Sequence, residues 1–93
     1  MIANFADRET RRVWDGSGSR KLPPSIQSVA RRKLRMLNNA TSLEELRIPP
    51  GNRLEALKGN FTGLHSIRIN SQWRICFRWQ DSNAHDVQII DYH

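Results

Sequence analysis

The clearest pattern in the chain lies between Gly63 and Trp79, where apolar and polar residues alternate along two arms. The arms are residues 64–69 and 73–79, and in each of them every second side chain is apolar or aromatic. This period of two is typical of strands with one buried face. The polar break at residues 70–72 has the length of a hairpin loop. The pattern therefore predicts an antiparallel β-hairpin.

The polar positions of this hairpin would share the face opposite the core. They are Ser66, Arg68, Arg74 and Arg78. A third alternating run, Asp86 to His93, follows a polar loop expected at residues 80–86 and should pair with the second arm, which would bring Tyr92 to the same face. The pattern thus predicts a basic platform with one aromatic ring. A solvated sheet face without a function is the alternative, since antiparallel sheets commonly expose one side to water.

Two helices are predicted before the hairpin. The first covers residues 7–14, with Asp7 as its N-cap, and the Gly- and Ser-rich residues 15–21 after it predict a mobile loop. The second begins at Pro23-Pro24, since proline is tolerated in a first helical turn, and should run to Asn38 or Asn39. Its apolar face, at helical spacing, consists of Ile26, Val29, Ala30, Leu34 and Leu37.

The remaining segments complete an α+β arrangement. Residues 1–5 suit an edge strand, and Thr41–Glu45 carries the capping signal of a short helix that Pro49-Pro50-Gly51 would end. Arg53–Gly59 should be a strand or an extended entry into the sheet. We expect one domain, residues 1–93, with both helices on one face of a small antiparallel sheet and an exposed basic face opposite.

The composition indicates which classes of partner the protein could bind. The net charge is +6 and most of the 15 basic residues are arginine, whose planar fork matches phosphate oxygens, so nucleic acid is favoured. An acidic protein partner or a gain in solubility would also suit this charge. The single cysteine, Cys76, excludes an internal disulfide, and no Cys/His spacing indicates zinc, so neither a metal nor a cofactor is expected. No signal sequence or membrane span is apparent, which predicts a cytoplasmic protein that binds no membrane.

Four stretches of the sequence are informative when taken together. They are RLEALKG at 53–59, SIRIN at 66–70, QWRICF at 72–77 and Asp-Tyr-His at 91–93. In this combination and order they resemble the HigB toxins, the plasmid-maintenance killer group of the RelE/ParE superfamily. The resemblance covers nearly the whole chain and implies a RelE-like fold and a toxin of a type II toxin–antitoxin system.

The resemblance also implies an activity and partners. HigB-type toxins are ribosome-dependent mRNA endonucleases that act in the ribosomal A site without a metal ion and so inhibit translation and growth. The RNA 2′-hydroxyl attacks the adjacent phosphate and leaves a cyclic phosphate and a free 5′-hydroxyl. The implied partners are the ribosome, mRNA and a helix-turn-helix antitoxin of the HigA type from the adjacent gene, with operator DNA bound only through the toxin–antitoxin complex.

The family's functional positions carry over to five residues, Lys58, Arg74, Asp91, Tyr92 and His93. Arg74 and Lys58 would neutralise the phosphorane, Tyr92 would stack on a base or hold the 2′-hydroxyl, and His93 would move a proton near neutral pH. The predicted RNA-binding residues are Arg68, Arg74, Arg78 and Lys58.

One position departs from the family pattern. Several HigB nucleases have a histidine three residues before the lysine, where this chain has Glu55. A glutamate can act as a general base if its pKa is raised, whereas neighbouring cations lower the pKa and favour an ion pair. Two other functions remain open. They are a gyrase poison like those of the ParE branch, and a nucleic-acid-binding module on the same fold that cleaves nothing.

Overall fold

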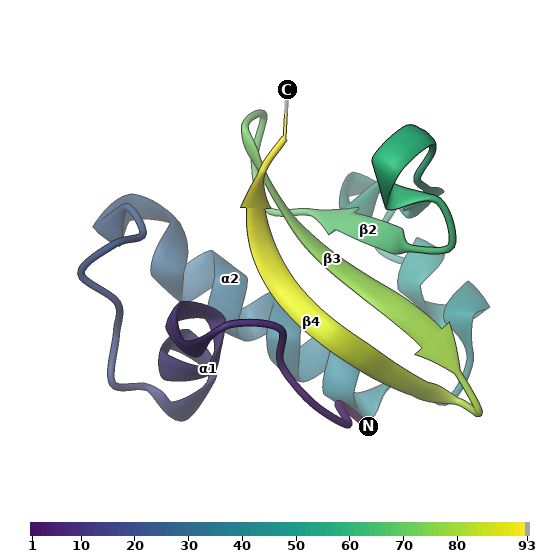
Figure 1. Cartoon of the computed structure of the whole chain (residues 1–93), viewed down its shortest axis with the longest axis horizontal. Helices are drawn as coiled ribbons and strands as arrows, with labels where there is room; N and C mark the ends of the chain where they lie inside the picture. The colour runs from purple at the N-terminus through teal and green to yellow at the C-terminus, as the bar shows by residue number, and fades with distance from the viewer. Residues whose placement is uncertain (93) are drawn as a thin grey trace.

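The computed structural model describes residues 1–92 and places two helices before a four-stranded antiparallel sheet (Figure 1). The helices are α1 (Arg8–Asp15) and α2 (Pro24–Asn39), and the strands are β1 (Glu55–Ala56), β2 (His65–Arg68), β3 (Trp73–Gln80) and β4 (Asn83–Asp91). The strands are ordered β1-β2-β3-β4, so each pairs with its neighbour along the chain. The predicted α+β architecture is confirmed.

Strands β2 and β3 form the predicted hairpin, in which Arg68 lies opposite Arg74. The side chain of Asn70 fixes the connecting loop, because its Oδ1 accepts hydrogen bonds from the backbone N–H groups of Gln72 (2.9 Å) and Trp73 (2.8 Å). Asparagine commonly stabilises turns in this way. The loop therefore holds a fixed position at one end of the sheet.

The prediction of a loop at residues 80–86 is wrong, because β4 already begins at Asn83. The turn between β3 and β4 consists of Asp81 and Ser82, with φ values of 53° and 62°. Two left-handed residues in succession are typical of the tightest hairpin turns, because their twist matches that of the strands. His85 therefore belongs to β4, where it lies opposite Arg78.

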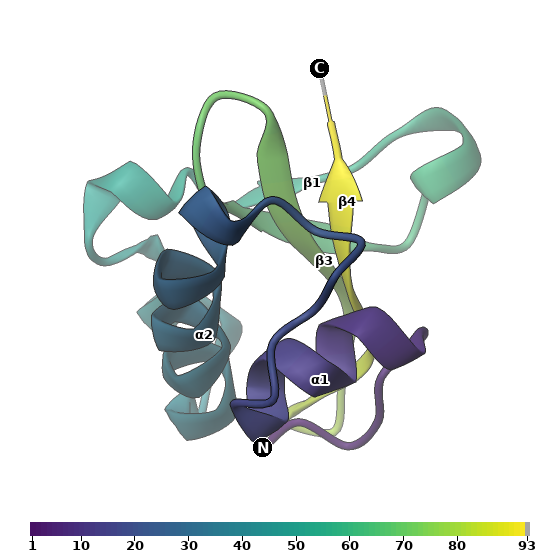
Figure 2. The ribbon, with the colours of Figure 1, turned by 90° about the vertical axis from the view of Figure 1, so that its left-hand side faces the viewer.

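Both helices cover the same face of the sheet, as predicted (Figure 2). The carboxylate of Asp7 accepts a hydrogen bond from the backbone N–H of Thr10 at 2.6 Å and caps α1, while the hydroxyl of Thr10 accepts one from the N–H of Ile89 in β4. The core between the two layers includes Val13, Ile26, Leu34, Leu37, Ile67, Ile75 and Phe77. The sheet is thus supported from one side by an apolar layer.

The loop predicted to be mobile, between α1 and α2, is held by side-chain hydrogen bonds. Ser19 is buried, and its hydroxyl donates to Glu9 of α1 at 2.6 Å. The side-chain amide of Gln27 in α2 donates to the backbone carbonyls of Ser19 and Leu22. These bonds fix the part of the loop that contains Arg20 and Lys21.

The connecting segments largely follow the prediction. Residues 1–6 run beside β4 in parallel, where the N–H of Ala3 donates to the carbonyl of Ala84 (2.8 Å), although they form isolated bridges rather than a strand. Three short 3-10 helices precede β2, namely η1 (Leu43–Arg47), η2 (Pro50–Asn52) and η3 (Gly59–Phe61). Within residues 1–92, neither helix has the length and apolar character needed to cross a bilayer.

Candidate functional site

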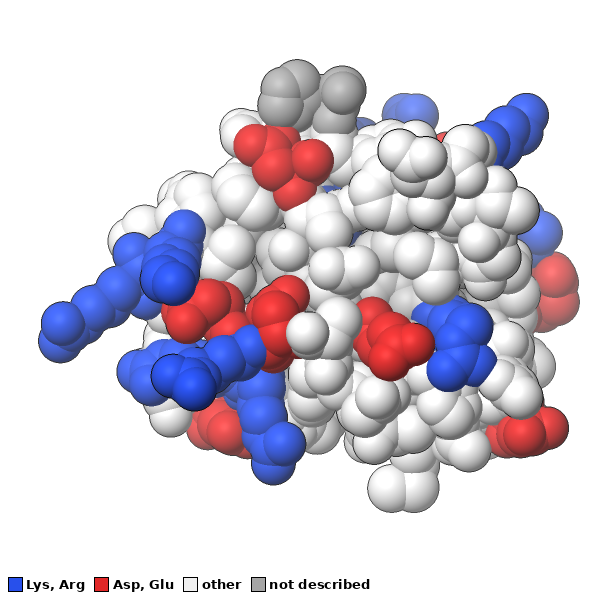
Figure 3. All heavy atoms as spheres, viewed as in Figure 1, with Lys and Arg blue, Asp and Glu red and all other residues white. Residues whose placement is uncertain are grey.

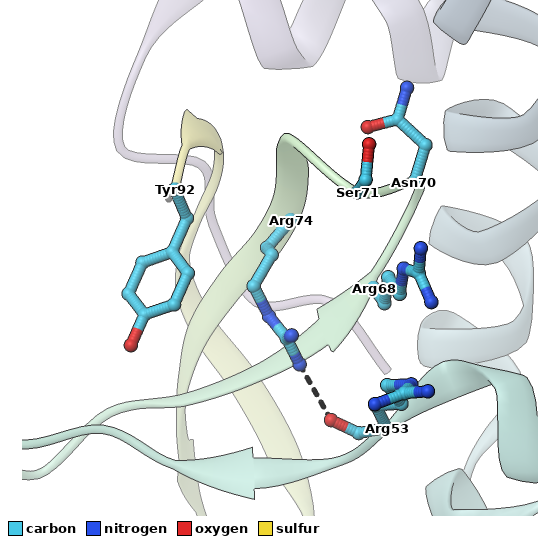
Figure 4. Close-up of a pocket in the computed structure, with 6 residues that line it drawn as sticks. All are labelled: Arg53, Arg68, Asn70, Ser71, Arg74 and Tyr92. Atoms are coloured by element: carbon cyan, nitrogen blue, oxygen red, sulfur yellow. Dashed lines mark hydrogen bonds between the residues drawn. The ribbon is translucent and has the colours of Figure 1, made fainter.

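A hollow of about 430 Å³ opens where the β2–β3 hairpin loop, the turn after η2 and the end of β4 meet (Figure 4). Its lining residues are Arg53, Arg68, Asn70, Ser71, Arg74 and Tyr92. We refer to this site as the arginine hollow. Three of its six lining side chains are guanidinium groups and none is acidic, so the site suits an anion.

The pairing of the strands explains why these residues meet. Arg68 and Arg74 lie directly opposite each other on β2 and β3, so their side chains share one face of the sheet. The backbone N–H of Tyr92 donates to the carbonyl of Gln72 at 2.7 Å, which extends the β3–β4 pairing beyond Asp91. The guanidinium carbon of Arg74 consequently lies 5.7 Å from the centre of the Tyr92 ring, within cation–π range.

Arg74 is buried, contrary to the prediction of a fully open polar face. Only 8% of Arg74 is exposed, and its neighbours Ser66 and Cys76 on the same face are fully buried. Its Nε donates to the hydroxyl of Ser66 at 2.7 Å, and an Nη atom donates to the backbone carbonyl of Arg53 at 2.6 Å. Burial lowers the pKa of Arg74 from its ordinary value, and the Glu55 carboxylate acts in the opposite direction. Burial also raises the pKa of the Cys76 thiol to about 11.

Glu55 forms the other contact of Arg74. Its carboxylate oxygen lies 3.6 Å from an Nη atom of Arg74, an ion pair longer than a hydrogen bond. The Glu55 side chain is 45% exposed, whereas that of Arg74 is 10% exposed. Neutral acceptors, the Ser66 hydroxyl and the Arg53 carbonyl, therefore fix the inner side of the guanidinium. A more exposed carboxylate, that of Glu55, lies beside a second side of the same group. A phosphate oxygen can replace such a carboxylate.

Arg53 reaches the hollow through a backbone conformation that the sequence pattern did not reveal. It has a φ of 45° and follows η2 directly. This left-handed residue turns the chain so that its side chain lines the hollow and its carbonyl accepts the bond from Arg74. The predicted platform of three arginines and a tyrosine is therefore present, but with Arg53 in place of Arg78.

Arg78 does not line the arginine hollow. The β3–β4 register shifts between Cys76 and Arg78, and the Arg78 guanidinium pairs with Asp86 at 3.4 Å near the far turn of the sheet. Four residues of strand, or roughly 13 Å, separate it from Arg74.

The other predicted site residues lie around the hollow or outside the described chain. Lys58 is exposed at the start of η3 and does not line the hollow. Asp91 lies opposite Trp73 and accepts a hydrogen bond from the Gln72 side chain at 3.0 Å. His93 is outside the described residues.

A second group of cations lies on the helical side of the molecule. Arg8, Glu9, Arg12, Arg20 and Lys21 surround a hollow of about 340 Å³. We call these residues the α1 cluster. Lysine and arginine side chains gather over α1 and the following loop in the surface view (Figure 3). The hydrogen bonds of Ser19 keep the loop residues of this cluster beside the helix.

The arrangement in the arginine hollow favours phosphate chemistry. A buried, oriented arginine presents fixed donors in a site of reduced solvation, where each donor stabilises negative charge more strongly than it would in water. The exposed ring of Tyr92 offers a surface for a nucleobase. Residues 1–92 contain no group of three or more His, Cys, Asp or Glu side chains that could hold a metal ion.

Comparisons with known proteins agree with this reading. Residues 3–93 match a family described as the RelE-like toxin HigB of type II toxin–antitoxin systems. The chain is 42% identical to Toxin HigB-1 of Vibrio cholerae over 85 residues, which cover 90% of each protein. It is 27% identical to Endoribonuclease HigB of Proteus vulgaris over the full length of both.

A solved structure supports the fold independently. The YoeB–YefM complex from Staphylococcus aureus contains a chain that superposes with a TM-score of 0.62 at 17% identity, covering 100% of this chain and 98% of that chain. At this identity the likeness concerns the fold alone. The match of the family over 91 residues and the 42% identity to a HigB toxin decide the assignment. The chain belongs to the HigB family of RelE-like toxins of type II toxin–antitoxin systems.

Proposed function

We propose that this toxin is an endoribonuclease that cleaves mRNA on the ribosome, and that the arginine hollow is its active site. The observation that carries the proposal is the buried guanidinium of Arg74, held by Ser66 and Arg53 and placed beside the Tyr92 ring. The name of the Proteus vulgaris relative, Endoribonuclease HigB, supports the reaction class.

The reaction would proceed by attack of the RNA 2′-hydroxyl on the adjacent phosphorus. The new O–P bond forms as the bond to the 5′-oxygen breaks, which leaves a 2′,3′-cyclic phosphate on one fragment and a 5′-hydroxyl on the other. Arg74 and Arg68 would stabilise the added negative charge of the phosphorane, so no metal ion is required in this mechanism. Lys58 would contact the RNA at the edge of the site.

Two protons move in this reaction. A base removes the proton of the 2′-hydroxyl, and an acid gives one to the departing 5′-oxygen. Tyr92, Glu55 and His93 are the candidates, with Asp91 supporting the end of β4 that carries Tyr92. The Glu55 carboxylate lies 3.6 Å from Arg74, at the edge of the proposed phosphate site.

The partners follow from the same assignment. We propose that a HigA-type helix-turn-helix antitoxin neutralises the toxin, and that the ribosome orients the mRNA in the hollow, because a sparse catalytic set gains most from a substrate held in position. The cations of the α1 cluster would contribute to ribosome binding through phosphate contacts.

The decisive experiment compares translated and free mRNA. The purified toxin should cut an mRNA that is being translated and cut the same RNA poorly without ribosomes. The fragments should carry a 2′,3′-cyclic phosphate and a 5′-hydroxyl. Ribosome binding without cleavage would refute the nuclease assignment, and equal cleavage of free RNA would refute the dependence on the ribosome.

A further inference from the structure

Lys33 is a buried charge that the proposed reaction does not use. It lies in α2 on the face that packs against the sheet, between Ala30 and Leu37, and only 7% of it is exposed. Lysine is among the residues least often buried in proteins. Its position within an otherwise apolar helical face therefore calls for an explanation.

The ammonium group of Lys33 has a specific partner. Its Nζ donates to the backbone carbonyl of Arg68 at 2.5 Å. Arg68 is the last residue of β2, immediately before the loop that carries Asn70 and Ser71. A single side chain of the helical layer thus contacts the strand end from which half of the arginine hollow is built.

The pairing of the sheet explains why this carbonyl needs a partner. The N–H of Ile69 bonds to the carbonyl of Trp73, so the preceding pair, Arg68 and Arg74, is the one whose backbone groups point away from each other. On the other side, β1 pairs with β2 only as far as Ser66. The carbonyl of Arg68 therefore extends past the end of β1, and Lys33 supplies the missing donor.

An apolar side chain at position 33 would avoid the cost of burying an ammonium group, but it would leave the Arg68 carbonyl without this donor. Burying an ammonium group is unfavourable, and apolar replacements of buried charges are often neutral or stabilising. The neighbouring cations add to this disadvantage, because burial and the charges of Arg32, Arg68 and Arg74 lower the pKa of Lys33. The contact with Arg68 connects this buried charge to the adjacent site.

We propose that Lys33 is a positioning residue of the arginine hollow, which holds the carbonyl of Arg68 from the helical side and so fixes the hairpin end that carries Arg68, Asn70 and Ser71. The role in catalysis rests on the proposed function. The positioning itself does not, so the two can be tested separately.

The positioning is tested by amide hydrogen exchange in the Lys33→Met variant. Methionine keeps the unbranched apolar stem and removes the donor. Exchange at Ile69 and Trp73 should become roughly 5- to 10-fold faster, as expected for the loss of one hydrogen bond, while amides in the middle of β3 stay unchanged. Arg32→Met is the matched control, since it removes an exposed charge from the preceding position of the same helix. Unaltered exchange at both hairpin amides in Lys33→Met would overturn the proposal.

The consequence for catalysis is tested by the rate of mRNA cleavage on ribosomes. Lys33→Met should lower kcat by roughly 10- to 10²-fold, because small displacements of a catalytic group have effects of this size. Ribosome affinity should not fall, and the urea midpoint should fall by no more than the loss of one hydrogen bond allows. Wild-type toxin in the same assay tests the proposed function itself. A wild-type kcat in Lys33→Met, or a loss that only follows the fraction unfolded, would contradict the proposed role of Lys33.

Discussion

Arg74 has both a structural role and a proposed role in binding phosphate. Its inner donors hold together three segments of the chain, through Ser66 of β2 and the carbonyl of Arg53 after η2. Its outer side faces the hollow, between Tyr92 and the loosely paired Glu55. The orientation that makes the guanidinium useful for binding a phosphate is therefore produced by the same bonds that stabilise the sheet.

Arg74→Ala is expected to impair both stability and activity. Removing the side chain leaves the Ser66 hydroxyl and the Arg53 carbonyl without their donor, and one such buried loss costs about 1–3 kcal/mol. Cleavage should fall by roughly 10²–10³-fold, as for the loss of a group that stabilises developing charge. Urea unfolding and cleavage on ribosomes measure the two effects. Arg78→Ala, which removes the contacts with Asp86 and Gln80 outside the hollow, is the control and should leave cleavage unchanged.

The Glu55→Gln variant shows whether Glu55 acts as a general base or only as the ion-pair partner of Arg74. We expect cleavage to be retained or increased, because glutamine cannot compete by charge with the substrate phosphate for Arg74. Single-turnover cleavage on ribosomes measures this. A fall of about 10²–10⁴-fold would instead identify Glu55 as the general base. If His93→Ala lowers the rate while Glu55→Gln does not, one of the two proton transfers belongs to His93 and neither belongs to Glu55.

At the scale of the elements, the sequence predicts those features that depend on periodicity. Alternation along the chain was enough to pair Arg68 with Arg74 and to bring Tyr92 to their side. Alternation does not reveal which members of the predicted basic face line the hollow, and Arg78 pairs with Asp86 instead. Arg53 was missed for a different reason. Its left-handed turn and its contact with Arg74 join residues 21 positions apart, and no local pattern encodes such a contact.

One further signal was present in the sequence. Lys33 interrupts the apolar face of α2, and a charge in such a stripe is a reason to look for a buried partner. The identity of the partner, the carbonyl of Arg68, depends on where β1 ends. Helix and sheet therefore meet at a polar contact that neither element predicts alone.

The burial of Lys33 should make stability depend on pH. Its pKa in the folded state lies below the ordinary value of 10.5, so in the window between the two values the unfolded state binds more protons than the folded state. Stability therefore rises with pH through this window. The free energy of unfolding of the wild type, measured relative to Lys33→Met in urea, should increase from neutral pH towards 10.5. A difference that stays constant across this range would show that the ammonium group is not destabilised by burial.

At the scale of the molecule, seven of the 15 basic residues gather in two regions. The arginine hollow lies where the hairpin loop meets the end of β4, and the α1 cluster lies over α1 and the loop that follows (Figure 3). Placing Arg8 in the first turn of α1 is unfavourable, because helix N-termini favour negative charge. The α1 cluster is thus better suited to binding an anionic partner than to stabilising its own helix.

Charge reversal in the α1 cluster should weaken ribosome binding without affecting the chemistry. In the double variant Arg8→Glu with Lys21→Glu, the affinity for the ribosome should decrease. The slope of log affinity against log salt concentration should become shallower by an amount equivalent to about one to two phosphate contacts. Arg11→Glu is the control, because Arg11 lies on the same helix outside the cluster and pairs with Asp15 at 3.9 Å. Binding as tight as that of the wild type at every salt concentration would remove the α1 cluster from the ribosome-binding surface.

The burial of Cys76 has a practical consequence for following this toxin in single-molecule fluorescence. The chain contains one cysteine, and a thiol with a pKa of about 11 carries far less thiolate near neutral pH than an ordinary exposed thiol. Ser25 is exposed in the first turn of α2, where a helix N-terminus would make a cysteine more reactive. In Ser25→Cys a maleimide dye would attach at that residue while the native thiol stays unlabelled and in place.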